Sequence, residues 1–415
     1  MGDLRFAAEN GVTFRRAGDA LRRALGHALL MATTLSWGQA AKAPDSQRQE
    51  AFSLEQQGKD AAAEAAWRGY LKTHGTSAEA YAHIGLLEAR QEHYKEAVPF
   101  YRKALALNPA FPGLRLNLGL ALFKGGDLKQ AANEFSLLLK TAPHGSPESQ
   151  RLTILVGMAH YGLNEYAQAV PYLKAAAAED PQNLQLRLAL AHSCLWSKQY
   201  QCVLDAYHEI LTLNAESAEA DMLAGEAQDE LKNHAGAIEQ FRAAVRADPK
   251  EPDVHFGLGY LLWSQRLYPE AVSEFEAELK NNPNHVQALI YLGDAQMQMN
   301  HPEAAEPLLT SAEHIDAGRE LAHLDLGILY ADAGRKDEAL RELQAAARLA
   351  PDDVTVHWRL GRLYKASGMK DEAKAEFDKA SKITKAADDK LIDKMSGARE
   401  KPPPVQAPAG AQENK

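Results

Sequence analysis

Small and apolar residues recur at fixed intervals along this chain of 415 residues. The segment from Ala78 to Phe111 sets the pattern, with Gly85 in its first half and Ala97 and Tyr101 in its second. The glycine recurs in steps of 34 residues, apart from one step of 38 and one alanine in its place, at Gly119, Gly157, Ala191, Gly225, Gly259, Gly293, Gly327 and Gly361. Nine repeats in one register predict a single supersecondary element stacked many times.

Each repeat is predicted to be a pair of antiparallel helices. Gly85 and Ala97 mark where the two helices of a hairpin come closest, because larger side chains there would force strained packing. Tyr101 is expected to fill the space toward the next hairpin, and Pro109 to end the second helix. Gly257 and Gly259 form a helix-packing pair on this interpretation, since no strand precedes them as a dinucleotide site would require.

The pattern resembles that of the tetratricopeptide repeat family, in which a Leu-Gly pair is followed by an alanine, an aromatic residue and a closing proline. The repeat from Ala218 to Glu251 shows it with Gly225, Phe241 and Pro249. The resemblance covers about three quarters of the chain. It implies an all-α fold, a right-handed α-solenoid of stacked antiparallel hairpins.

The register divides the chain into four segments. Residues 78–383 hold the nine repeats. Residues 41–77 keep the spacing without the Gly and Pro markers, which is typical of a terminal cap hairpin that meets solvent on one face. Residues 384–415 are predicted to be a polar capping segment followed by a disordered Pro- and Ala-rich tail. Residues 1–40 lie outside the register.

The first 40 residues resemble an export signal. Arg15, Arg16, Arg22 and Arg23 precede an uncharged run, and Gly38-Gln39-Ala40 offers small residues for cleavage before Ala41. The run is too short to cross a bilayer. A periplasmic or secreted protein is therefore predicted. The alternative is an amphipathic or disordered leader on a cytoplasmic protein, which the acidic residues of the leader and His27 favour.

Charge and motifs exclude several function classes. The formal net charge is −10, and this sign opposes nucleic-acid binding or attraction to an anionic membrane. Membrane insertion of the mature chain is not expected. The sequence contains no zinc-protease, phosphate-loop or hydrolase motif. We therefore predict a protein that is not an enzyme and that has no metal or cofactor.

The family resemblance implies which residues meet a ligand, because its first helices line a concave channel. Carried over by register, these positions combine aromatic and apolar residues with an acidic stripe and a basic end. The predicted binding residues are Leu120, Phe123, Arg151, Met158, Tyr161, His192, Trp196, Glu226, Asp229, Tyr260, Trp263 and Arg362. For the aliphatic members, packing between adjacent first helices is an equal alternative, since apolar stripes at helical spacing are usually core.

A scaffold function follows from these features. The channel is expected to bind a peptide segment of a protein partner that carries basic and apolar residues, in an envelope assembly or secretion complex. The alternative is a glycan- or polymer-binding solenoid whose aromatic residues stack on sugar rings. The oligomeric state is left open by the sequence.

Cys194 and Cys202 lie on either side of the turn in the fourth repeat. As free thiols they would be small buried hydrophobic residues. In an exported protein a disulfide between them becomes plausible, and both alternatives stay open at this point.

Overall fold

The computed structural model describes residues 46–213 and 217–397, and all regular structure in these residues is helical. The chain divides into two compact units, Met1–Gly257 and Leu258–Lys415, with the division inside one helix. The predicted export signal and the tail after residue 397 lie outside the described residues. Among the helices that are described, none has both the length and the apolar character needed to cross a bilayer.

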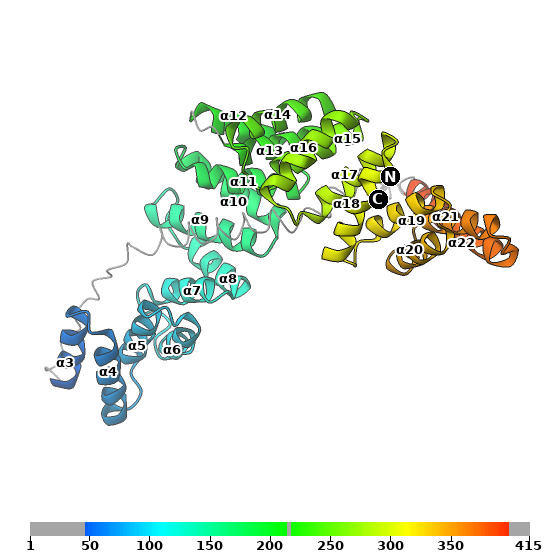
Figure 1. Ribbon diagram of the computed structural model, residues 1–415. Helices are drawn as coiled ribbons and strands as arrows, with labels where there is room; N and C mark the ends of the chain where they lie inside the picture. Colours follow the sequence, from blue (N-terminus) through cyan, green and yellow to red (C-terminus); the bar gives the residue numbers. More distant parts are fainter. Residues whose placement is uncertain (1–45, 214–216, 398–415) are drawn as a thin grey trace, which may run out of the picture. The chain divides into compact units, whose positions relative to one another are not determined.

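The helices follow one another as hairpins, in which odd-numbered helices come first and even-numbered helices second (Figure 1). In the N-terminal unit they are α3 (Ser46–Gln56), α4 (Asp60–His74), α5 (Ala78–Arg90), α6 (Tyr94–Leu107), α7 (Leu114–Lys124), α8 (Leu128–Leu139), α9 (Pro147–Gly162), α10 (Tyr166–Glu179), α11 (Leu184–Trp196), α12 (Tyr200–Thr212), α13 (Ala218–Glu230) and α14 (His234–Ala247). The division falls in α15 (Val254–Ser264). The C-terminal unit continues with α16 (Tyr268–Asn281), α17 (Val286–Gln298), α18 (Pro302–Ile315), α19 (Glu320–Asp332), α20 (Lys336–Leu349), α21 (Val354–Ala366) and α22 (Lys370–Gly397).

The recurring glycine of the first helix allows close contact with the second helix of its hairpin, facing an aromatic ring in some repeats and a leucine in others. A Cβ atom at Gly85 would lie 2.8 Å from the ring of Tyr101, so only glycine lets the two helices approach this closely. The aromatic ring therefore packs first against its own hairpin, not only toward the next one as the sequence analysis expects. Phe241 does both, because its ring contacts Gly225 and also Gly257 of the following helix.

The turn between the two helices has a left-handed residue at the same position of every repeat. The φ angle there is 62° at Glu92, 65° at Lys232 and 75° at Gly334. Only glycine adopts this conformation without a steric cost. The sequence analysis did not identify this position because its residue type varies along the chain.

Side-chain caps fix where several first helices begin. The Ser77 hydroxyl accepts a hydrogen bond from the Ala80 N–H at 3.3 Å, and the Ser217 hydroxyl accepts one from the Ala220 N–H at 3.2 Å. Asp353 caps α21 in the same way, accepting from the Thr355 N–H at 2.7 Å. These caps satisfy backbone donors that have no partner inside the helix.

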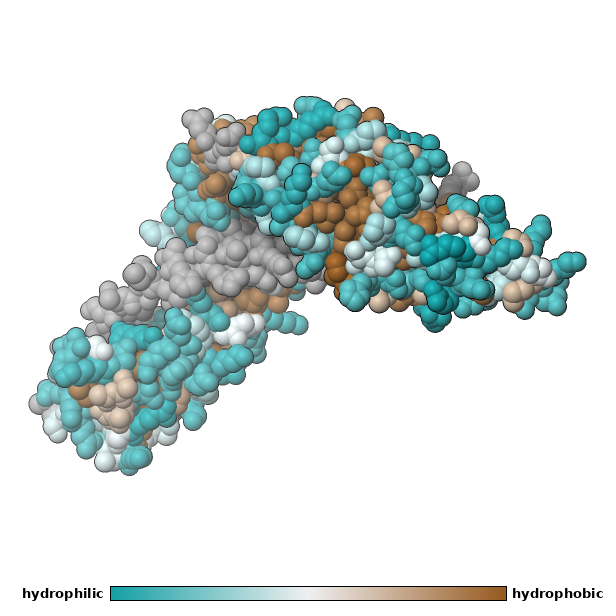
Figure 2. Space-filling view, viewed as in Figure 1, coloured by the Kyte–Doolittle hydropathy of each residue, from teal (hydrophilic) through white to brown (hydrophobic). Residues whose placement is uncertain are grey.

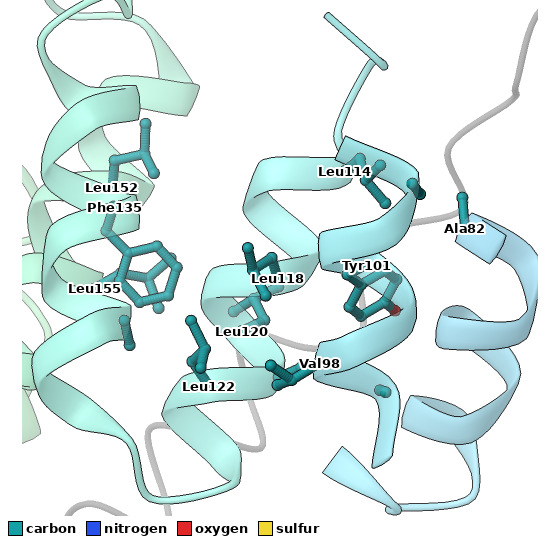
Figure 3. Close-up of a cluster of buried hydrophobic side chains, with 14 of the residues drawn as sticks. Ala82, Val98, Tyr101, Leu114, Leu118, Leu120, Leu122, Phe135, Leu152 and Leu155 are labelled. Atoms are coloured by element: carbon teal, nitrogen blue, oxygen red, sulfur yellow. The ribbon is translucent and has the colours of Figure 1, made fainter. Parts of the chain in front are cut away.

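The core consists of local clusters between neighbouring hairpins. The largest side chains of the cluster in Figure 3 are Tyr101 from α6 and Phe135 from α8, with leucines of α7 and α9 around them. Another cluster, around Trp67, joins the α3–α4 hairpin to α5. The surface of α3 to α6 is largely hydrophilic (Figure 2). Each hairpin is thus stabilised by its neighbours, as expected for a repeat protein.

The last described helix extends past residue 383, where the repeat register is predicted to end. Helix α22 runs without a break from Lys370 to Gly397, so the polar capping segment continues the second helix of the last repeat. No proline or glycine interrupts residues 370–396, and nothing in this stretch stops the helix.

Candidate functional site

The predicted binding residues all lie on first helices. Those from Leu120 to Asp229 belong to α7, α9, α11 and α13 of the N-terminal unit. Tyr260, Trp263 and Arg362 belong to α15 and α21 and fall in the C-terminal unit. We call the part of these helices that reaches solvent the first-helix face, and describe it separately for each unit.

Five of the predicted residues are almost completely buried. The exposed fractions of their side chains are low at Leu120 (7%), Met158 (1%), Tyr161 (2%), His192 (3%) and Tyr260 (5%). Leu120 lies among the leucines between hairpins (Figure 3). A buried side chain cannot contact a partner without rearrangement. These five residues therefore pack in the interior next to the first-helix face and are not part of its surface. The half-buried or exposed members that reach it are Phe123, Arg151, Trp196, Glu226, Asp229, Trp263 and Arg362.

Trp196 is part of an aromatic cluster on α9, α10 and α11. Its ring stacks on Tyr166 with centroids 6.1 Å apart, and Tyr166 meets Tyr161 edge-on at 5.8 Å. Beneath them the Tyr161 hydroxyl and His192 Nδ1 lie 3.0 Å apart. Burial lowers the pKa of His192 to about 4, so its imidazole is neutral at pH 7. The sequence analysis missed Tyr166 because it considered only first helices, and Tyr166 is the first residue of the second helix α10. Its position beside the turn between α9 and α10 is the signal that could have identified it.

Helix α13 contributes the acidic part of the first-helix face. Glu226 and Glu230 stand one turn apart, and Asp229 lies beside them. His234 Nδ1 lies 2.6 Å from Asp229 Oδ1, and the Tyr200 hydroxyl donates to Glu230 Oε2 at 3.3 Å. Two of these three carboxylates are therefore held by neighbouring side chains.

Glu226 differs from its neighbours. Part of its side chain is open to solvent, but Oε1 is enclosed and has no hydrogen-bond partner within the described residues. Burial raises the pKa of Glu226 to about 8, and Glu230, Asp229 and Asp253 add to the rise by charge repulsion. The carboxyl group is therefore mostly protonated near pH 7.

A second carboxyl group with a raised pKa, that of Glu219, lies near the start of the same helix. Burial, followed by repulsion from Glu251, raises the pKa of Glu219 to about 7. Burial also raises the pKa of Glu251, with Asp248 and Asp253 contributing. We call Glu219, Glu226, Asp229 and Glu230 together the acidic face of α13.

The C-terminal unit has its own aromatic cluster. Trp263 contacts Tyr260 with ring centroids 5.9 Å apart and Tyr291 at 5.0 Å. Its indole N–H donates to Asp294 Oδ2 at 2.6 Å. The sequence analysis missed Tyr291 and Asp294, both of which lie on α17, because α17 contributed no residue to the predicted set.

The remaining predicted residues have individual environments. Phe123 packs against Phe135 at 6.3 Å between centroids, and burial lowers the pKa of Arg151. On α21 the Arg362 guanidinium lies over the ring of Trp358 at 4.9 Å, and that tryptophan is 46% exposed.

Cys194 and Cys202 are joined by a disulfide in the structure, with their Cα atoms 5.8 Å apart. The bond links α11 to α12 across their turn, next to the aromatic cluster that contains Trp196. It therefore constrains the hairpin that positions this tryptophan.

One group in the C-terminal unit has the composition of a metal site. Ligand atoms of Glu313, His323 and Glu342 lie within 4.8 Å of one another. However, His323 is engaged through both nitrogens, Nδ1 with Glu342 Oε2 at 2.8 Å and Nε2 with the Ala317 carbonyl oxygen at 3.1 Å.

The same arrangement recurs one repeat later without a third carboxylate. His357 meets Glu376 at 2.6 Å and the Pro351 carbonyl oxygen at 2.7 Å, and Ala347 stands at the position that corresponds to Glu313. The recurrence indicates that these histidines connect the two helices of a hairpin to the preceding loop, and we assign no metal to them.

Comparison with known proteins identifies the family of this chain. Two sequence profiles of the tetratricopeptide repeat match the chain, one over residues 88–153, 161–201, 300–357 and 330–388 and the other over residues 49–113, 204–252 and 256–320. BBSome complex member BBS4 from Bos taurus is 23% identical over 300 residues, which are 72% of this chain and 57% of BBS4. Protein O-mannosyl-transferase TMTC1 from Homo sapiens is 26% identical over 145 residues, which are 34% of this chain and 16% of TMTC1. The chain thus spans only part of these relatives.

Solved structures of repeat proteins match parts of the chain. YrrB, described as a TPR protein with an unusual peptide-binding site, is 22% identical with a TM-score of 0.37, over 43% of this chain and 92% of that one. MamA from Desulfovibrio magneticus RS-1 is 20% identical with a TM-score of 0.38, over 41% of this chain and 97% of that one. The repeat register, the stacked hairpins and the profile matches together show that this chain belongs to the tetratricopeptide repeat family.

Proposed function

We propose that this chain is a non-enzymatic scaffold that binds a peptide segment of a protein partner on its first-helix faces. One observation carries the proposal. In each unit a partly exposed tryptophan packs on other aromatic residues: Trp196 stacks on half-buried Tyr166, which in turn meets buried Tyr161, and Trp263 contacts buried Tyr260 and Tyr291. Rigid aromatic side chains at a surface are typical anchors of protein recognition, because they bury large areas at little cost in conformational entropy.

The composition of the partner follows from the neighbouring charges. The acidic face of α13 favours basic residues beside the apolar residues that would contact Trp196. The similarity to BBS4, which is named as a member of a protein complex, is consistent with a role in an assembly. No turnover by the purified chain alone is expected.

Substitution of the tryptophans tests this function. Partners are first identified by cross-linking in native extract, and the captured segment is then titrated against purified variants by fluorescence anisotropy. Trp196→Ala or Trp263→Ala should weaken binding at least about tenfold, because burying a large aromatic side chain contributes roughly 1.5–3 kcal/mol. Leu211→Ala, at a 47% exposed leucine on second helix α12, is the control and should bind like the parent. If both tryptophan variants are folded by circular dichroism and bind like the parent, the first-helix faces are not the site.

The cellular setting that we propose is the envelope, in an assembly or secretion complex. The support is the Arg-rich leader with its apolar run and small residues before Ala41, in the part of the chain outside the described residues. N-terminal sequencing of the protein from its own cell should begin near Ala41. An intact Met1 on a cytoplasmic protein would contradict export.

Glycan binding is a second candidate, favoured by Trp358. This ring is 46% exposed with Arg362 over it, and an exposed aromatic ring provides a surface on which a sugar ring could stack. Titration of the chain with soluble oligosaccharides, compared with Trp358→Ala, distinguishes the two functions.

A further inference from the structure

We propose that Glu226, at the centre of the acidic face of α13, receives a Lys or Arg side chain of the partner segment. This inference deepens the proposed function and rests on it, since the cation belongs to the same bound peptide. The first observation is the enclosed Oε1 atom of Glu226, which has no hydrogen-bond partner in residues 46–213 and 217–397. Buried polar atoms without partners are rare, and each one calls for an explanation.

Two side-chain donors beside the acidic face of α13 are engaged with its other carboxylates. Tyr200 on α12 donates to Glu230, and His234 on α14 lies against Asp229. The charges that act on Glu226 come from carboxylates, including Asp253 just before α15. The local field at Glu226 therefore attracts a cation from outside the chain.

A long cationic side chain suits this face better than a bound metal ion. The groups of carboxylate and histidine atoms in the described residues that lie within 4.8 Å of one another do not include Glu226. Glu226 is therefore not part of a ready-made set of three metal-ligand side chains in the described residues. A Lys or Arg side chain instead reaches in with its charged end and leaves its apolar stem against the surrounding surface.

Glu219 and Glu226 are the two carboxyl groups on α13 with raised pKa values, and their spacing indicates how basic residues should be spaced in the bound peptide. Glu219 and Glu226 are seven residues apart and so lie on the same side of α13, with their Cα atoms about 10 Å apart along the axis. In a polyproline II peptide, residues three apart share one face and are separated by about 9 Å. Two basic residues at this spacing match the two carboxyls, so the partner motif is Lys/Arg-x-x-Lys/Arg in an extended segment.

Docking of the cations is coupled to proton release. Without a partner, Glu226 and Glu219 have pKa values of about 8 and about 7 and keep their protons at lower pH. A nearby ammonium or guanidinium group favours the ionised carboxylate, so the bound state holds fewer protons than the free state. Affinity should therefore rise with pH up to about pH 8, by up to about tenfold per pH unit for each proton released.

Other titratable groups around Glu226 set the background for this dependence. The charges that act on Glu226 directly are those of Asp229, Glu230 and Asp253. His234 contacts Asp229, Tyr200 donates to Glu230, and the charge of Lys232 acts on Tyr200. The raised pKa of Tyr200 keeps its hydroxyl group protonated. Glu226→Gln isolates the contribution of the one carboxyl in question.

The test uses fluorescein-labelled proline-rich peptides of about ten residues as probes, each with one tryptophan for the apolar contact. One probe has two lysines three residues apart, a second has them two residues apart, and a third has two glutamates three residues apart. Anisotropy titrations with the full chain are run at about pH 6 and about pH 8. The variants are Glu226→Gln, Trp196→Ala and the control Glu239→Gln, whose side chain on α14 is 65% exposed.

We expect the first probe to bind most tightly and to gain at least about tenfold in affinity between the two pH values. Glu226→Gln should lose at least about tenfold at the higher pH and most of the pH dependence, while Glu239→Gln resembles the parent. Calorimetry in buffers of different ionisation enthalpy should register the released proton.

Two results would overturn the inference: affinity for the lysine probes that does not change with pH, or a Glu226→Gln variant that binds like the parent. Absence of any preference for lysine over glutamate counts against it in the same way. If Glu226→Gln behaves like the parent and Trp196→Ala binds weakly, the proposed function stands without the cation site. If Glu226→Gln abolishes binding and Trp196→Ala does not, the cation site stands and the aromatic anchor fails.

Discussion

Phe241 lies between two glycines, and replacement of either one tests how the repeats pack. A Cβ atom added at Gly225 would lie 2.6 Å from Phe241 Cδ2, about 1 Å inside normal contact between carbon atoms. The ring cannot yield in the opposite direction, because it also contacts Gly257 on the next helix. Gly225→Ala must therefore push the ring outward or separate α13 from α14.

The chain contains a natural version of this substitution. In the fourth repeat Ala191 replaces the glycine, and the facing aromatic residue is Tyr207. Tyr207 is 9% exposed, whereas Tyr101 and Phe241, which face glycines, are each 1% exposed. Its hydroxyl group also donates a hydrogen bond to Asp221 Oδ1 at 2.7 Å. Phe241 has no hydroxyl group and would gain no such bond.

The magnitude follows from two opposing terms. Overpacking costs roughly 1–3 kcal/mol, and alanine is favoured over glycine inside a helix by about 1 kcal/mol. We expect Gly225→Ala to destabilise the α13–α14 region by up to about 2 kcal/mol. The matched control is Gly69→Ala on α4, where an added Cβ meets no atom within 4 Å, and this variant should gain up to about 1 kcal/mol.

Native-state hydrogen exchange is the appropriate assay, because repeat proteins open locally and a single unfolding free energy is not well defined for them. Faster exchange in α13 and α14 should accompany Gly225→Ala, and slower exchange in α4 should accompany Gly69→Ala. Equal protection of α13 in the parent and in Gly225→Ala would refute the argument that the glycine is required by Phe241.

Two further predictions concern stability. Lys232→Gly should stabilise its hairpin by about 1 kcal/mol and slow native-state hydrogen exchange in α13 and α14, because a left-handed lysine is strained. Gly334→Lys should destabilise the α19–α20 hairpin by a similar amount, and unchanged exchange in both variants would exclude strain at this position. Reduction of the Cys194–Cys202 disulfide should destabilise its hairpin by about 2–3 kcal/mol, the low end of the usual range because the closed loop is short. Thiol titration of the denatured, unreduced protein checks whether the bond is present. Two free thiols would contradict it.

The hairpins could be predicted from sequence because the same pattern occurs nine times. A single Gly–aromatic pair such as Gly85 and Tyr101 is a weak signal, but its recurrence at one spacing fixes the helix pairs. The family assignment is confirmed by the profile matches. The Gly257–Gly259 interpretation is also confirmed, since the two glycines face Phe241 and Phe275.

The division of the first helices into surface and interior could not be predicted in the same way. Helix α11 buries ten of its thirteen residues, whereas α12 buries four of thirteen. A first helix is covered by its own partner and by the helices of adjacent repeats, so apolar residues occur around much of its circumference and periodicity no longer identifies the exposed side. For this reason the register assigned His192 and Met158 to the binding surface, although both are buried.

The acidic residues illustrate the limit of sequence for electrostatics. Sequence analysis gave Glu226 and Asp229 one role, because both are carboxylates on the same helix. In the structure Asp229 lies against His234 beside the α13–α14 turn, whereas Glu226 is enclosed and mostly protonated near pH 7. Removal of the Asp229 charge would therefore disturb the turn as well as the surface, while Glu226→Gln keeps the shape and the neutrality of the protonated acid and removes its ability to ionise. A bound cation is attracted fully only by the ionised carboxylate of Glu226. The affinity of this face is therefore expected to depend on pH, although the sequence alone suggests that Glu226 is always charged near pH 7.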